Sequence, residues 1–93
     1  MSIEDIQKVI LALIPKYPIR KIILFGSRAA GTQRADSDVD LIMEFFGPVT
    51  LLTLSKIKCE LEEVFGVPVD VIHGPIEKTD MIEVKDEVVL YAA

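Results

Sequence analysis

Residues 24–45, LFGSRAAGTQRADSDVDLIMEF, place a polar connection between two apolar runs. The first run breaks at Gly26 and Ser27, and the second carries Asp38 and Asp40 at alternate positions. Side chains of a strand alternate between its two faces, so the two carboxylates share one face and the apolar residues around them share the other. The stretch therefore predicts two strands joined by a turn and a short helix, with both aspartates on the open side of a sheet.

The elements on either side follow from the spacing of apolar residues and from the positions of proline and glycine. The predicted elements are, in chain order, a helix from Ile3 to Ile14 ended by Pro15, a strand over 20–25, a short helix through Ala29 and Ala30, a strand over 37–45, a long helix opened by Gly47 and Pro48 and stopped by Gly66, a strand over 67–72 and a mixed helix from Ile76 to Val88. One face of the long helix is expected to carry Leu51, Leu54, Ile57, Leu61 and Val64. The order α-β-α-β-α-β-α predicts an α/β (α+β) fold, with helices packed on a small mixed three-stranded sheet and residues 1–93 in a single domain.

Asp38 and Asp40 disfavour each other's ionisation unless a cation lies near both. Mg²⁺ takes one or two carboxylates and completes its octahedron with water and phosphate oxygens. A third aspartate, Asp70, interrupts the valines of the strand over 67–72, and alternation places it on the face opposite to those valines. If the two strands are neighbours, the three carboxylates can hold two metal ions for nucleotidyl transfer, with Asp70 as candidate general base. Glu44 shares the face of the first two aspartates but lies further along the strand.

The turn at Gly26 and Ser27 is suited to phosphate binding. Glycine lets the backbone approach a ligand closely, and the amides at a helix start receive phosphate oxygens. The Ser27 hydroxyl can donate a further hydrogen bond, although a serine here can equally be an ordinary helix N-cap. Arg28 and Arg34 are near enough in sequence to add positive charge, although such arginines more often lie on the surface.

Composition limits the classes of function. The net charge is −5, which argues against broad, sequence-independent nucleic-acid binding. No apolar stretch approaches the roughly 18 residues of a membrane span, and the acidic start differs from a signal peptide. With Cys59 as its single cysteine, the chain is expected to be soluble and cytoplasmic. Hydrophobic residues make up 51% of the chain, which fits a dense core and a partner-covered surface equally well.

A glycine–serine pair, ten residues, an Asp-Val-Asp and a later aspartate in an apolar strand together resemble a known family. The pattern is similar to that of the nucleotidyltransferase superfamily that includes DNA polymerase beta. The short chain resembles the minimal, MNT-type branch, whose members are often the antitoxins of HEPN/MNT toxin–antitoxin pairs. The ending DEVVLYAA is similar to the EAV-LY ending common in that branch.

The resemblance implies roles for particular residues. It implies that the catalytic residues and metal ligands are Asp38, Asp40 and Asp70. It implies that the nucleotide is bound by Gly26, Ser27 and Arg28. It further implies Mg²⁺, with two ions, and ATP or another NTP as donor. For antitoxin members it implies adenylylation of a tyrosine on a co-encoded, small helical HEPN toxin. Many relatives read GSRARG, whereas this chain has Ala30 in place of the second arginine, so any contact made by that side chain is lost here.

Two other functions stay open at this point. The chain could transfer a nucleotide to a small molecule, such as an antibiotic, using a dimer-built pocket or a second domain. It could also be an antitoxin that blocks its toxin by binding alone. The sequence does not identify the donor base, the acceptor residue, the number of units transferred, or a homo- or hetero-oligomeric state.

Overall fold

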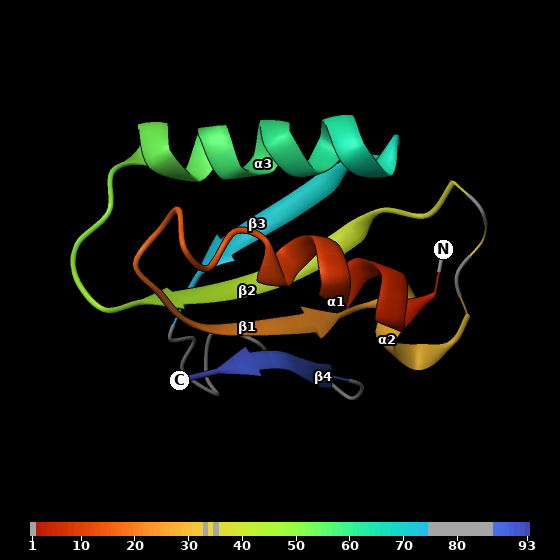
Figure 1. Cartoon of the computed structure of the whole chain (residues 1–93). Helices are drawn as coiled ribbons and strands as arrows, with labels where there is room; N and C mark the ends of the chain where they lie inside the picture. Colours follow the sequence, from red (N-terminus) through yellow and green to blue (C-terminus); the bar gives the residue numbers. More distant parts are fainter. Residues whose placement is uncertain (1, 33, 35, 75–86) are drawn as a thin grey trace.

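A four-stranded mixed sheet with strand order β3-β2-β1-β4 forms the centre of the computed structural model (Figure 1). The structure describes residues 2–32, 34, 36–74 and 87–93. Among these residues, no helix is long and apolar enough to cross a membrane. The elements are α1 (Ile3–Leu11), β1 (Ile19–Phe25), α2 (Ser27–Ala30), β2 (Val39–Phe45), α3 (Leu51–Phe65), β3 (Val69–His73) and β4 (Glu87–Ala92).

The central strand β1 pairs antiparallel with β2 on one side and with β4 on the other. Strands β2 and β3 run parallel, because α3 returns the chain between them to the starting end of β2. This parallel register pairs Val39 with Val69 and Asp40 with Asp70. The two aspartate-bearing strands predicted from the sequence are therefore direct neighbours.

Helices α1 and α3 both pack on one face of the sheet and enclose a single apolar core. The buried side chains of this core include Ile6, Ile10, Leu13, Ile22, Leu24, Val39, Leu41, Met43, Ile57, Leu61, Val69 and Leu90. Helix α1 begins with a capping box, since the Ser2 hydroxyl accepts from the Asp5 amide and the Asp5 carboxylate accepts from the Ser2 amide. Helix α3 ends at Gly66, whose φ of 70° lies in the left-handed region.

The predicted three-stranded sheet was wrong by one strand. Residues 87 and 88, predicted as the end of a helix, belong to β4, and the rest of that predicted helix lies outside the described residues. The valine, leucine and tyrosine side chains of 88–91 favour a strand, and β4 pairs with an edge of β1 that would otherwise expose unpaired backbone groups. The mixed α/β class, with helices packed on a sheet, is confirmed.

Helix α3 ends at Gly66 as predicted, but it begins later than predicted, and two residues expected on its buried face are exposed. It begins after Thr50 rather than at Gly47–Pro48, because the Thr50 hydroxyl accepts from the Thr53 amide and caps the helix. Leu51 is 82% exposed, since it lies six positions before buried Ile57, which turns it off the buried face of the helix. Val64 is 63% exposed, and neighbouring Phe65 packs against the core in its place.

Candidate active site

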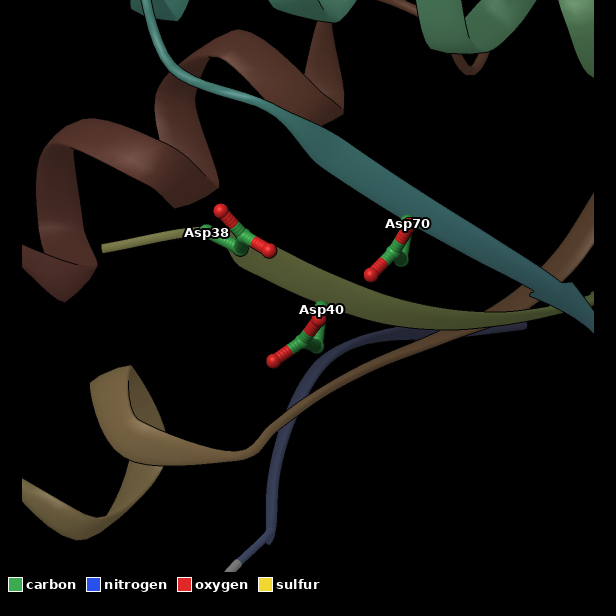
Figure 2. Close-up of side chains that lie close together, drawn as sticks. All are labelled: Asp38, Asp40 and Asp70. Carbon is green, nitrogen blue, oxygen red and sulfur yellow. The ribbon is translucent and has the colours of Figure 1, made fainter. Parts of the chain in front are cut away.

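Three carboxylates converge at the starting ends of β2 and β3, on the side of the sheet opposite to the core helices. One carboxylate oxygen from each of Asp38, Asp40 and Asp70 lies within 4.8 Å of the others. Figure 2 shows the first two side chains on the chain of β2 and the third on β3, all directed into one region. Asp38 and Asp70 are exposed, and Asp40 is half-buried. The structure thus brings together the three aspartates selected from the sequence.

The alternation of strand residues produces this arrangement. Val39 and Leu41 are fully buried in the core, so Asp40 between them must point to the other face. In β3, Val69 is fully buried and Asp70 is exposed, for the same reason. Asp38 lies immediately before β2, and the next amide, that of Val39, donates to the Pro68 carbonyl at 2.9 Å.

The electrostatics of the cluster favour a cation among the three carboxylates. Burial raises the pKa of the Asp40 carboxyl above its ordinary value, and a hydrogen bond with Asp70 and the charges of Asp70 and Asp38 raise it further. In the part of the chain that the structure describes, no lysine or arginine forms an ion pair with any of the three. Clustered carboxylate oxygens are the ligands that Mg²⁺ prefers, so the donor set fits this ion.

Gly26 brings the predicted phosphate-binding turn against the cluster. Its φ of 77° is a conformation that favours glycine, and a Cβ atom built on it would overlap the Asp40 carboxylate. Gly26 occupies the N-cap position of α2, and no side chain caps this helix. Ser27 is therefore the first helical residue and not the N-cap. The amides of Ala29 and Ala30 donate to the Gly26 carbonyl, each at 3.1 Å. The amides of Ser27 and Arg28 have no acceptor among the described backbone groups, which leaves these two amides able to bind phosphate oxygens beside the aspartates.

The two arginines predicted near the turn have different environments. Arg28 is only 4% exposed, and its guanidinium donates from Nε and Nη2 to the Ser37 carbonyl at 3.2 and 2.8 Å. Its described contacts are with the protein, and a role in nucleotide binding stays a prediction. Arg34 is exposed, and its backbone amide donates to the Ser37 hydroxyl at 2.7 Å.

Glu44 stands apart from the cluster, as its position along the strand predicts. It is 8% exposed and forms an ion pair with Arg20. Neither this pair nor the bond between Arg28 and Ser37 was found by sequence reasoning. Ser37 follows Arg28 by nine positions, and the two residues come together only in the folded chain.

Comparison with known proteins identifies the family of the chain. The chain matches the family described as "Nucleotidyltransferase domain" over residues 6–91, and it belongs to that family. A Methanocaldococcus jannaschii relative named "Putative protein adenylyltransferase" is 39% identical over 72 residues, which cover 77% of each chain. "Protein adenylyltransferase MntA" of Thermococcus cleftensis is 30% identical over 76 residues, again 77% of each chain. The protein is therefore a nucleotidyltransferase, as its resemblance to the minimal branch implied.

Solved structures with the same fold include two toxin–antitoxin complexes. A chain of a toxin–antitoxin structure with AMP-PNP has a TM-score of 0.76 and 18% identity, over 94% of this chain and 73% of that one. A chain from a complex of a tri-AMPylated Shewanella oneidensis HEPN toxin with its MNT antitoxin has a TM-score of 0.70 and 15% identity, over 94% and 70%. At these identities the similarity shows the nucleotidyltransferase fold.

Proposed function

We propose that this nucleotidyltransferase transfers AMP from ATP to a partner protein, in the presence of Mg²⁺, and that the partner is a HEPN-type toxin whose activity it blocks. The convergence of the three aspartates beside Gly26 and Ser27 carries the proposal. The relatives named as protein adenylyltransferases support AMP as the transferred group. The complexes of a HEPN toxin with an MNT antitoxin and of a toxin–antitoxin with AMP-PNP support the partner and the nucleotide.

The residues of the chain divide the reaction between them. The amides at the start of α2 and the Ser27 hydroxyl bind phosphate oxygens of the donor. Asp38, Asp40 and Asp70 would hold Mg²⁺, which when bound neutralises the negative charge that builds up on the phosphates during transfer. The exposed Asp70 is the candidate base that accepts the proton of the attacking hydroxyl.

The bonds formed and broken follow from this assignment. The oxygen of an acceptor hydroxyl forms a bond to the α-phosphorus of ATP, and the bond from that phosphorus to the bridging oxygen breaks. Pyrophosphate leaves with the electron pair of the broken bond, and the hydroxyl proton passes to the Asp70 carboxylate. The product is a phosphodiester between AMP and the acceptor side chain.

The test is incubation of the protein with ATP, Mg²⁺ and the small helical protein encoded beside it, followed by intact-mass and peptide mass spectrometry. We expect the partner to gain one or more AMP units at a tyrosine, and we expect no gain with the variant that combines Asp38→Asn and Asp40→Asn. If the double variant still blocks the toxin fully, the antitoxin acts by binding alone and the catalytic explanation of its action fails. If the partner gains no AMP while a hydroxylated small molecule does, the acceptor class is wrong.

A further inference from the structure

Arg28 is a charged side chain held inside the protein next to the catalytic cluster. It is 4% exposed, and among the described residues no carboxylate lies within ion-pair distance of it. Two of its nitrogens, Nε and Nη2, donate to one acceptor, the carbonyl oxygen of Ser37. Burying an arginine costs desolvation free energy, and two charge-assisted hydrogen bonds offset part of that cost. The buried guanidinium of Arg28 therefore holds one particular peptide group, the one that contains the Ser37 carbonyl.

That peptide group is the one that leads into Asp38. A peptide unit is planar, so fixing the Ser37 carbonyl also fixes the amide nitrogen of Asp38 and the direction toward its Cα atom. The following peptide group is fixed as well, because the Val39 amide donates to the Pro68 carbonyl at 2.9 Å. Both peptide planes of Asp38 are thus restrained, one by α2 and the other by the residue before β3.

Asp38 needs this restraint more than the other two aspartates. Asp40 and Asp70 lie within β2 and β3, and the strand register pairs them directly. Asp38 precedes β2, is exposed, and follows a loop. Besides the bond from Arg28, the described bonds that hold the backbone next to Asp38 are the one between Val39 and Pro68 and two local ones between Arg34 and Ser37. Of these, the bonds between Arg34 and Ser37 lie within the loop, so the bond from Arg28 is the one that ties the Ser37 peptide group to α2.

We propose that Arg28 is a positioning residue that orients Asp38, through the Ser37 carbonyl, for binding Mg²⁺ with the nucleotide. The inference rests on the proposed function. Because Ser27 is the adjacent residue in α2, the same four-residue helix sets both the phosphate-binding hydroxyl and the first carboxylate. Lysine cannot replace arginine in this role, since its single ammonium group lacks the planar fork that donates twice to one oxygen.

The test compares Arg28→Lys and Arg28→Met with Lys58→Met, which removes an exposed charge from α3. Calorimetry measures the binding of Mg²⁺ with a non-hydrolysable ATP analogue, and a second titration measures the analogue in EDTA. We expect both Arg28 variants to lower metal-dependent affinity by about 10–100-fold, the range for residues that orient metal ligands, while binding in EDTA and Lys58→Met stay unchanged. Circular dichroism first establishes that each variant is folded.

Other outcomes separate the competing explanations. Folded Arg28 variants with normal metal-dependent affinity would overturn the positioning role. Equal weakening of analogue binding with and without metal would instead make Arg28 a direct nucleotide ligand. If the unmodified protein binds neither metal nor analogue, the proposed function fails and not merely the role of Arg28.

A measurement on the unmodified protein keeps the proposal testable even if both variants unfold. The Arg28 Nε–H should exchange slowly with water, as seen by NMR, whether or not nucleotide is present. Fast exchange in the free protein would show that the bond to Ser37 does not hold the loop, and it would overturn the proposal.

Discussion

Strand β2 carries acidic residues at both ends of one face, and the protein treats the two ends in opposite ways. At one end, buried Glu44 forms an ion pair with Arg20. At the other end, Asp40 lies among Asp38 and Asp70, and no described lysine or arginine pairs with them. A carboxylate that serves stability is neutralised by the chain itself. The cluster of Asp38, Asp40 and Asp70 keeps its negative charge uncompensated, which is the property expected of groups that bind a cation together with its ligand.

The largest expected effect comes from removing the charge of the uncompensated end. Combining Asp38→Asn with Asp40→Asn should lower AMP transfer by at least about 10³-fold, because the electrostatic stabilisation of the transferred group is lost. Glu44→Gln removes a carboxylate from the same face of the same strand and should leave transfer close to that of the unmodified protein. Rates are measured with labelled ATP and the co-encoded partner. Equal losses in the two proteins would remove the distinction between the ends of β2.

A smaller loss is expected when the turn beside Asp40 gains a single carbon. Gly26→Ala places a Cβ against the Asp40 carboxylate and should lower transfer by about 10²-fold, the effect of misplacing a reacting group by roughly 1 Å. Gly31→Ala is a control for the positive φ alone, since Gly31 has the same φ of 77° but no described atom within 4 Å of the added carbon. Gly26 has a ψ of −156°, in a region essentially restricted to glycine, whereas Gly31 has a ψ of 16° in the left-handed helical region. A loss of transfer confined to Gly26→Ala therefore reports the turn at Gly26, through its backbone conformation and its contact with Asp40.

The two ends of β2 should respond in opposite directions when stability is measured. Glu44→Gln leaves Arg20 without its partner and should lower the free energy of unfolding by about 1–2 kcal/mol. Asp40→Asn removes a carboxylate that its neighbours disfavour, and the free energy of unfolding without metal should stay equal or rise. Urea unfolding in EDTA measures both. A destabilised Asp40→Asn variant would show that the cluster is held together by contacts other than those described.

The smallest expected effect is a dependence of metal-free stability on pH. The pKa of Asp40 is raised above its usual 3.8, chiefly by burial and then by Asp70 and Asp38, so the folded state binds this proton more tightly than the unfolded state does. The contribution of Asp40 to stability is therefore fully present below pH 3.8 and is lost as the pH rises through the higher folded value.

The change in this contribution is isolated by subtraction, because Asp5 has a lowered pKa and acts with the opposite sign. Urea unfolding in EDTA, at several pH values above 3.8, should show a more negative slope of stability with pH for the unmodified protein than for Asp40→Asn. Identical slopes in the two proteins would mean that Asp40 titrates normally.

Much of the site could be predicted from the sequence because its signals are local. Alternation along two short strands was enough to place Asp40 and Asp70 opposite the core, and the turn at Gly26 was visible as a break between apolar runs. The interpretation failed where tertiary contacts decide. The side chains of 88–91 favour a strand, but they do not indicate which strand is the partner, because β4 pairs with an edge of β1 that the chain reaches only after α3 and β3.

The role of Arg28 was hidden for a related reason. The buried guanidinium binds the Ser37 carbonyl, nine positions further along the chain. Sequence proximity to Ser27 suggested a surface arginine with access to the nucleotide, whereas the structure makes the side chain part of the interior. A backbone acceptor has no signature in a sequence, and contacts to it are found only in three dimensions.

Calorimetric titration of Mg²⁺ with a non-hydrolysable ATP analogue most directly tests whether the uncompensated end of β2 is completed by a cation. The unmodified protein and Glu44→Gln should show the same saturable, metal-dependent binding, and Asp40→Asn should lose it while remaining folded. Undiminished metal-dependent binding by Asp40→Asn, or none by the unmodified protein, would show that the three aspartates are not the metal–nucleotide site.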